Sequence, residues 1–244
     1  MADALLLLHA FPLDARMWAP QLDALGSNIR IVAPDHPGFG GSEIPDVMTM
    51  ELAAGSAIRA LDDAGVGRAL VCGLSMGGYV ALELWRRAPE RVSGFVFSNT
   101  RSGADSEEGA AGRRALAERL RTEGNAFFAD GPPGLLSANA SDELRARVRS
   151  IIAGQPAEAI AAASLGMAER PDSDPDLPGI DVPTLVVTGS EDSLIPPGVT
   201  SQMADAIPGA ELAVIEGVGH LSNLESPEEF SRLLDRQALR VGLR

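Results

Sequence analysis

The sequence predicts an α/β fold, namely a mostly parallel, doubly wound sheet with helices on both faces, and three observations support this prediction. Short apolar runs bounded by turn residues alternate with segments that carry apolar residues at helical spacing. The 244 residues suit one domain of this kind, which would bury about 70–75% of its unfolded surface. A Gly-x-Ser-x-Gly pentapeptide at residues 73–77 joins a strand pattern to a helix pattern by a sharp turn.

The strands are expected where the sequence is continuously apolar for a few residues, because a strand of a parallel sheet is buried on both faces. Leu5 to Leu8 and Ile29 to Ala33 are the first two such runs, and Ala69 to Cys72 leads into the pentapeptide. Thr184 to Gly189 and Leu212 to Ile215 continue the pattern near the end of the chain. The expected strands therefore cover residues 4–9, 29–34, 69–73, 92–98, 183–189 and 210–215.

The helices are expected between these runs. Gly78 to Trp85 carries apolar residues at helical spacing directly after the pentapeptide. Pro227 marks the start of the last helix, because proline at the first helical position loses no hydrogen bond. The expected helices cover residues 17–25, 50–64, 77–88, 197–207 and 227–239. Since strands alternate with helices, the sheet should be parallel and covered on both faces.

Residues 101–178 fit no sheet pattern and interrupt this alternation. Turn-rich, acidic flanks at residues 102–108 and 171–178 enclose stretches with helical spacing. Those stretches are Glu107–Glu123, Asp142–Ala153 and Pro156–Met167. We therefore divide the chain into an α/β core, residues 1–100 and 179–244, and a helical insertion, residues 101–178.

The pentapeptide places Ser75 on an abrupt turn, where small neighbours two residues away on either side let the backbone pass closely. Such a serine is a candidate nucleophile, and a serine nucleophile needs a base together with an acid that orients the base. The chain holds three histidines, of which His220 lies in a glycine-rich loop after the run that ends at Ile215. Either Glu191 or Asp192, which follow another expected strand, could supply the acid.

Five short motifs occur in order at the ends of the expected strands. They are Leu8-His9-Ala10-Phe11, the loop from Pro34 to Ser42, the pentapeptide from Gly73 to Gly77, Gly189 to Asp192 with Pro196, and Gly219-His220. In this order they resemble the motifs of the α/β-hydrolase fold superfamily, from the first strand to the last helix. The resemblance implies a catalytic triad of Ser75, Asp192 and His220, which selects the second of the two acids. It also implies an oxyanion hole formed by the backbone N–H groups of Phe11 and Met76.

Two features differ from the usual member of that family. The two antiparallel strands that commonly precede the first motif have no counterpart in this sequence, so we expect the fold to lack them. The strand at 29–34 should then form an edge of the sheet, and an uncovered edge favours pairing with another chain. We expect a monomer or a homodimer paired through this edge. Ala10 stands where the family usually has Gly, and its methyl group would either crowd the oxyanion hole or be tolerated.

The resemblance also implies a role for the insertion, because helices at this place in the superfamily form a lid over the substrate. The alternative is a helical decoration away from the site. The candidate side chains for an apolar substrate pocket come from the oxyanion segment and the insertion: Phe11, Phe127, Phe128, Leu135, Leu136, Leu165 and Met167.

The segment from Leu8 to Asp14, followed by Met17-Trp18, looks most like small bacterial carboxylesterases and 3-oxoadipate enol-lactonases. This resemblance implies a serine hydrolase that cleaves a small-molecule carboxylic ester through an acyl-enzyme, without a cofactor. A lactone hydrolase is the alternative. An enol-lactonase must hold a substrate carboxylate, for which Arg101 and Arg170 are the candidate cations.

Other readings of the same motifs stay open. A ligand receptor that retains the triad with little turnover is the alternative from another class. Carbon–carbon bond hydrolases, perhydrolases and lyases share the motifs, and fold alone does not separate them. Haloalkane dehalogenases and epoxide hydrolases are disfavoured, because they need a carboxylate where this chain has Ser75.

The composition excludes several classes of partner and indicates where in the cell the protein is located. The formal charge of −14 and a pI near 4.6 argue against a nucleic-acid partner, whose phosphates would be repelled. Cys72 is the single cysteine, so no intrachain disulfide is expected. No apolar stretch approaches the length of a membrane span, and no signal-peptide pattern is present, so we expect a cytoplasmic protein. The three histidines lack the spacing of a metal site, and no metal is expected.

Overall fold

The computed structural model describes residues 2–132 and 134–243, and six strands within them form a single sheet. The strands are β1 (Ala4–Leu8), β2 (Ile31–Val32), β3 (Ala69–Leu74), β4 (Val92–Ser98), β5 (Thr184–Gly189) and β6 (Glu211–Ile215). Their order is β2-β1-β3-β4-β5-β6, and every neighbouring pair is parallel. The predicted α/β class with a parallel sheet is confirmed, and the described residues add no antiparallel strand to it.

The strand order reverses between β1 and β3, and this reversal positions the site. The chain moves from β1 outward to β2 and then returns to place β3 on the other side of β1. At such a switch point the loops after the two central strands diverge and leave a crevice at their carboxyl ends. Phe11 follows β1 and Ser75 follows β3, so both residues lie at this crevice.

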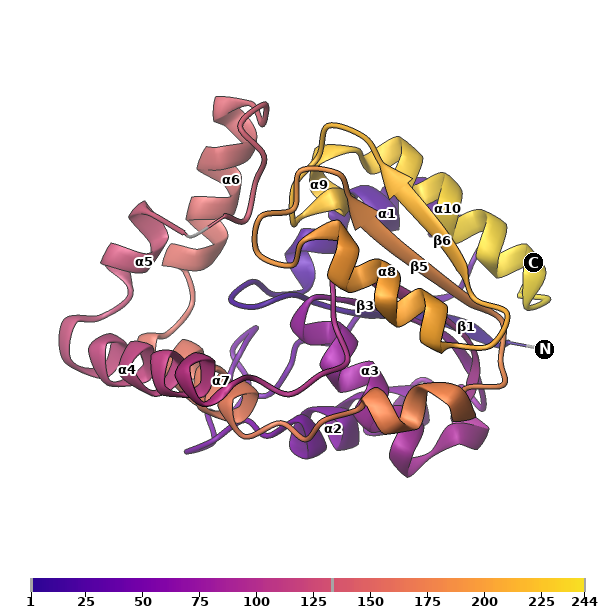
Figure 1. Cartoon of the computed structure of the whole chain (residues 1–244), viewed down its shortest axis with the longest axis horizontal. Helices are drawn as coiled ribbons and strands as arrows, with labels where there is room; N and C mark the ends of the chain where they lie inside the picture. The colour runs from indigo at the N-terminus through magenta and orange to yellow at the C-terminus, as the bar shows by residue number, and fades with distance from the viewer. Residues whose placement is uncertain (1, 133, 244) are drawn as a thin grey trace.

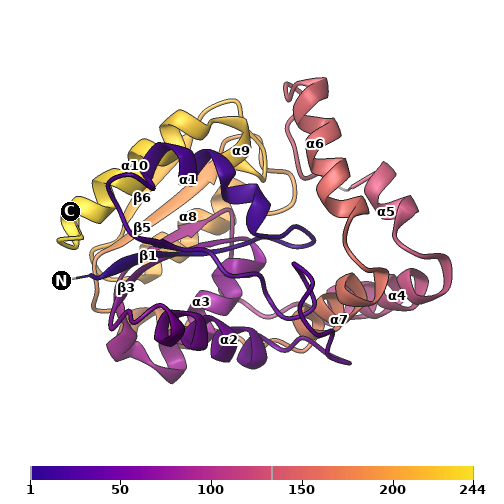
Figure 2. The same ribbon diagram turned by 180° about the vertical axis from the view of Figure 1, so that it is seen from behind.

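Helices cover both faces of the sheet (Figures 1 and 2). The helices of the core are α1 (Ala19–Leu25), α2 (Met50–Asp63), α3 (Met76–Arg87), α8 (Pro197–Ala206), α9 (Ser222–Glu225) and α10 (Pro227–Arg240). On one face α1 packs against α10, and on the other α2 packs against α3. Short 3₁₀ turns cover Ala15–Trp18, Pro89–Arg91 and Asp174–Gly179. The arrangement buries β1, β3, β4 and β5 along their whole length, as their apolar sequences require.

The insertion forms four further helices in the described residues, namely α4 (Glu107–Glu123), α5 (Ala126–Asp130), α6 (Asp142–Ala153) and α7 (Ala157–Ala168). Figure 1 shows them on the left, beyond the carboxyl ends of the strands. Ser106 caps the start of α4, because its side chain accepts a hydrogen bond from the Gly109 N–H, and Ser141 caps α6 in the same way. α4 packs along α7, and α5 packs along α6. The sequence did not predict α5.

Two expected elements differ from those observed by two residues or more at an end. The strand expected at 29–34 lies at the sheet edge, as predicted, but only Ile31–Val32 is paired. The Ile29 N–H donates instead to the Leu25 carbonyl, and Pro34 has no N–H to offer. The helix expected at 17–25 begins at Ala19, because a 3₁₀ turn precedes it and Pro20 occupies its first turn.

The edge position of β2 bears on the expected homodimer. A strand of two residues, Ile31–Val32, exposes few backbone groups for pairing with another chain, so the dimer through this edge stays a prediction. Among the described residues no single helix is long and apolar enough to cross a membrane. The pair α6 and α7 reaches the required length and composition only together, and the two helices are bent by 92° at the break between them.

Candidate active site

Ser75 lies on the turn between β3 and α3, where its backbone has a φ of 55° and a ψ of −115°. A non-glycine residue rarely adopts a positive φ, and such strain is concentrated at functional sites. The turn also requires glycine on both sides. A Cβ on Gly73 would lie 2.3 Å from the Gly77 carbonyl oxygen, and a Cβ on Gly77 would lie 2.0 Å from the Leu8 carbonyl oxygen. The two glycines therefore let the strand end and the helix start approach each other closely.

Asp192 and His220 are brought together by the loops that follow β5 and β6. The Nδ1 of His220 lies 2.8 Å from Oδ2 of Asp192, while Oδ1 accepts hydrogen bonds from the N–H groups of Leu194 and Ile195. Burial alone would raise the pKa of Asp192, but the hydrogen bonds and the charge of His220 outweigh it and hold the pKa below its usual value. Because the carboxylate is ionised, it keeps the imidazole proton on Nδ1. Glu191, the other candidate acid, is exposed.

Asn99 connects the acid to the loop of the histidine, and the sequence analysis gave it no role. It follows β4 with a φ of 46°, and its Nδ2 donates to Oδ2 of Asp192 at 2.9 Å and to the Gly219 carbonyl at 3.2 Å. Its Oδ1 accepts hydrogen bonds from Ser98 at 2.8 Å and Ser222 at 2.6 Å. The sequence signal that could have identified Asn99 is an amide side chain at the end of β4. This strand lies between β3, which precedes Ser75, and β5, which precedes Asp192.

One cavity of about 220 Å³ brings Ser75 and His220 together with side chains of the insertion. It is smaller than the typical range of ligand sites, about 300–1,000 Å³, and therefore suits a small molecule. Among the hydrogen bonds of the described residues none joins the Ser75 hydroxyl to His220, so the two groups share the cavity without a preformed bond. The other lining residues are Phe11, Pro12, Tyr79, Arg101, Arg113, Leu116, Phe128, Leu135, Met167, Leu194 and Ile195.

The candidate pocket residues separate into two groups. Those that line the cavity are Phe11, Phe128, Leu135 and Met167. The other three are not among the described residues that line it. Phe127 lies under the guanidinium of Arg119, Leu136 lines a separate cavity between α5 and α6, and Leu165 packs against the hydrophobic core. α4, α5 and α7 each bring only one or two side chains to this cavity, and apolar character alone did not identify which ones.

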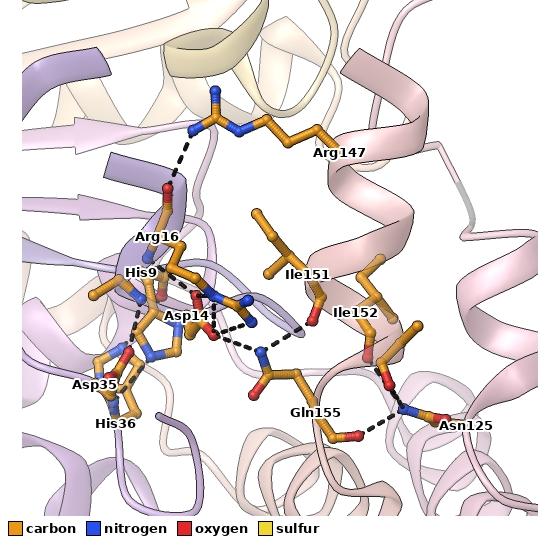
Figure 3. Close-up of polar contacts among 12 residues, drawn as sticks. His9, Asp14, Arg16, Asp35, His36, Asn125, Arg147, Ile151, Ile152 and Gln155 are labelled. Atoms are coloured by element: carbon orange, nitrogen blue, oxygen red, sulfur yellow. Dashed lines mark hydrogen bonds and ion pairs between the residues drawn. The ribbon is translucent and has the colours of Figure 1, made fainter. Parts of the chain in front are cut away.

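The loop that carries Phe11 is held by two buried histidines (Figure 3). The Nε2 of His9 accepts a hydrogen bond from the His36 N–H at 2.9 Å, so the His9 proton is on Nδ1, which donates to the Ala10 carbonyl at 3.1 Å. Nε2 of His36 donates to the His9 carbonyl at 3.2 Å. Burial lowers the pKa of both histidines, which are therefore neutral and fix the loop. Ala10 is fully buried, so its methyl group is accommodated in the core.

The same loop is tied to the insertion through Asp14 (Figure 3). Its Oδ2 accepts a hydrogen bond from Nε2 of Gln155 at 2.6 Å, just after the end of α6, and from Nη2 of Arg16 at 2.7 Å. Asn125 holds the other side of Gln155 by donating to its carbonyl at 2.6 Å. Burial alone would raise the pKa of Asp14, but the hydrogen bonds of Arg16 and Gln155 hold it below its usual value. Loop and insertion are thus joined by a charged contact.

Three arginines and one carboxylate form a cluster at the cavity wall. Asp105, whose side chain is 2% exposed, accepts hydrogen bonds from Arg101, Arg113 and Arg170. Burial alone would raise the pKa of Asp105, but the hydrogen bonds and charges of Arg170 and Arg113 lower it to about 2. Arg170 is buried behind the cavity, with its guanidinium 4.2 Å from the centroid of the Tyr79 ring. Arg101 lines the cavity, as does Arg113, which the sequence did not single out.

Together, the parallel sheet, the strained serine after β3 and the acid and histidine after β5 and β6 are characteristic of the α/β-hydrolases. Residues 5–233 match the model of the Alpha/beta hydrolase family, and the chain belongs to this family. Among the described residues no group of three or more His, Cys, Asp and Glu side chains is placed to hold a metal ion.

Three similar proteins place the chain within the family. A thermophilic esterase from Thermogutta terrifontis, solved with malate bound, is 38% identical and has a TM-score of 0.94, with 99% of this chain and 92% of that chain covered. The enol-lactonase from Burkholderia xenovorans LB400 is 30% identical, with a TM-score of 0.88 and coverage of 97% and 91%. The "Putative carbamate hydrolase RutD" of Rhizobium rhizogenes is 30% identical over 222 residues, which cover 88% of this chain and 84% of that protein.

Proposed function

We propose that this hydrolase cleaves small carboxylic esters through an acyl-enzyme, with Ser75 as nucleophile, His220 as base and Asp192 as the acid that orients the base. The observation that carries the proposal is the convergence of a strained serine and a carboxylate-bound imidazole on one small cavity. The likeness to an esterase at 38% identity supports ester chemistry.

The proposed reaction has two halves. The oxygen of Ser75 attacks the ester carbonyl carbon while Nε2 of His220 takes the hydroxyl proton. The tetrahedral intermediate collapses, the proton passes from His220 to the departing alcohol, and an acyl-enzyme remains. Water then attacks the acyl carbon with His220 again as base, and the carboxylic acid leaves. Asp192 stabilises the imidazolium in both halves. Nucleophile and base must close to hydrogen-bond distance when substrate binds, as commonly happens in hydrolases.

The negative charge on the carbonyl oxygen needs donors that are already in place. The N–H of Met76 suits this role, because the first N–H groups of a helix have no partner within the helix and carry the positive end of its dipole. The N–H of Phe11 is the second proposed donor, on a loop that His9 and His36 hold in place.

We further propose that the insertion is a lid. Leu116, Phe128 and Met167 of the insertion line the same cavity as Ser75 and would exclude water from the acyl-enzyme while substrate is bound. The contact of Gln155 with Asp14 joins the lid to the loop that carries Phe11, so that a movement of the lid is transmitted to this loop.

A panel of substrates tests the proposed function. We expect the purified enzyme to turn over nitrophenyl acetate and butyrate many times and to lose activity as the acyl chain outgrows the cavity. Ser75→Ala should lower kcat by roughly 10⁴–10⁶. A loss smaller than tenfold would exclude Ser75 as the nucleophile. A burst of one equivalent without further turnover would instead support a ligand receptor that retains the triad.

A lactone hydrolase is the second candidate. It is favoured by the likeness to an enol-lactonase at 30% identity and by the placement of a cation, Arg101, in the cavity. Adding a lactone, an enol-lactone and a nitrophenyl carbamate to the panel separates these chemistries by kcat/KM, with the carbamate included because of the relative named for that reaction.

A further inference from the structure

The cavity at Ser75 has an unusual charge for this protein. The chain carries a formal charge of −14, yet the described residues that line the cavity include no Asp or Glu. They include two arginines, Arg101 and Arg113, whose side chains are 36% and 23% exposed. A cavity whose charged walls are of one sign concentrates ligands of the opposite sign.

The buried carboxylate behind this wall does not balance its charge. Arg170 binds both oxygens of Asp105, with Nη2 3.0 Å from Oδ1 and Nη1 2.9 Å from Oδ2. A bidentate pair of this kind already neutralises a carboxylate. Arg101 and Arg113 also contact Asp105, so three guanidinium groups face a single carboxylate and the cluster retains two positive charges. Those two charges belong to the arginines that line the cavity.

Arg101 also has a donor without a partner. Within the described residues its Nε is buried and makes no hydrogen bond, while only one of its terminal nitrogens is used by Asp105. Buried N–H groups are nearly always paired. The Nε of Arg170 is also unpaired but lies behind the cavity wall, whereas Arg101 lines the cavity and could donate to an acceptor from outside the chain. A carboxylate fits, because it can accept two parallel hydrogen bonds from a guanidinium group.

We propose that the substrate is an ester or lactone that carries a free carboxylate, and that Arg101 and Arg113 form the subsite for that carboxylate. The inference rests on the proposed ester-hydrolase function and names its substrate class. Arg101 lies at the start of the insertion, just after β4, whereas Arg113 lies on α4. An anion held by both residues would therefore connect the carboxyl end of β4 with α4 above Ser75.

Matched pairs of substrates test this proposal. The first pair is the mononitrophenyl ester of glutaric acid and its primary amide, in which the carboxylate is on the acyl side. The second is butyryloxyacetate and its primary amide, in which the carboxylate is on the alcohol side. We expect kcat/KM, corrected for uncatalysed hydrolysis, to favour the carboxylate in one pair by about tenfold to a hundredfold. The preference should lie mainly in KM and should shrink as sodium chloride is added.

Variants of Arg101 and Arg113 test whether these two residues cause the preference for the carboxylate. Arg101→Gln and Arg113→Gln should each reduce the ratio of carboxylate to amide about tenfold. Arg119→Gln is the matched control, because it removes the same charge from α4 at a position where the guanidinium covers Phe127 and pairs with Glu123. Its ratio should equal that of the wild type, and thermal unfolding verifies that each variant is folded.

The outcomes distinguish this proposal from the proposed function. Hydrolysis of both members of each pair without a preference for the carboxylate would overturn the subsite and leave the ester hydrolase standing. A preference that survives in both the Arg101 and Arg113 variants would also overturn it. Hydrolysis of neither member of either pair would overturn the proposed function, and the subsite with it.

Discussion

Replacing Asp105 with Asn tests the charge cluster behind the cavity. The substitution keeps the shape of the side chain but removes the carboxylate that pairs with Arg101, Arg113 and Arg170. Breaking a buried ion pair by removing one partner typically costs about 3–5 kcal/mol, because the remaining charge is left uncompensated. Three guanidinium groups would be left here, so we expect a cost within this range.

The lowered pKa of Asp105 gives a second value for the stability that Asp105→Asn would lose. Its fall from 3.8 to about 2 corresponds to roughly 2 kcal/mol of stability at neutral pH, since one pKa unit is worth about 1.4 kcal/mol. The two routes bracket a loss of about 2–5 kcal/mol for Asp105→Asn. For a chain of this length, that loss would lower Tm by roughly 4–20 °C.

The pH dependence has a definite sign. A depressed pKa in the folded state means that the ionised Asp105 stabilises the fold fully above its unfolded value of 3.8 and that this contribution is lost as the pH falls toward about 2. The difference in Tm between wild type and Asp105→Asn should therefore be largest above pH ~5 and should shrink below pH ~4.

Thermal unfolding followed by circular dichroism over this pH range measures the effect. Asp130→Asn is the control, because Asp130 pairs with Arg149 at the surface, where both side chains are about 60% exposed. Such a pair contributes about 0–1 kcal/mol, and its removal should change Tm little at any pH. A variant Asp105→Asn as stable as the control, or a deficit that stays constant with pH, would refute the reasoning.

Three further predictions concern the site and the core. Asp192→Asn should lower kcat by about 10⁴, because Asp192 contacts the imidazole of His220. Glu191→Gln should change kcat less than about threefold. Steady-state kinetics that reverse this order would assign the role of the acid to Glu191. Asn99→Asp replaces a donor amide beside Asp192 with a second carboxylate. We expect kcat to fall roughly tenfold to a hundredfold with KM nearly unchanged. An unaltered kcat would show that Asn99 does not help to position Asp192. Burial raises the pKa of the Cys72 thiol, so Ellman's reagent should react with the protein only after unfolding, and rapid reaction of the native protein would show that β3 is accessible.

Much of the core could be predicted because local sequence and burial agree there. The apolar runs of the central strands, such as Leu5 to Leu8, are buried on both faces of the sheet. A continuous apolar run of this length predicts a strand without any knowledge of the tertiary structure. The turn at Ser75 could be predicted because its glycines are a local steric requirement. The positions of Asp192 and His220 followed from a resemblance, and the structure joins the two side chains.

The rest depends on contacts between segments that are distant in sequence. The cavity position of Arg113 and the burial of Arg170 follow from the packing of α4 against α7, for which a single helix pattern gives no information. α7 is apolar almost all round, so its pattern did not show that Met167 lines the cavity while Leu165 does not. Asn99 was missed because an uncharged residue carries no signal until its neighbours are known.

Mass spectrometry of the enzyme after reaction with a fluorophosphonate tests the central claim most directly. We predict a single phosphonyl adduct, formed with loss of fluoride, on the peptide that contains Ser75, together with complete loss of ester hydrolysis. An adduct on another residue, or full activity after Ser75 has been modified, would contradict the account.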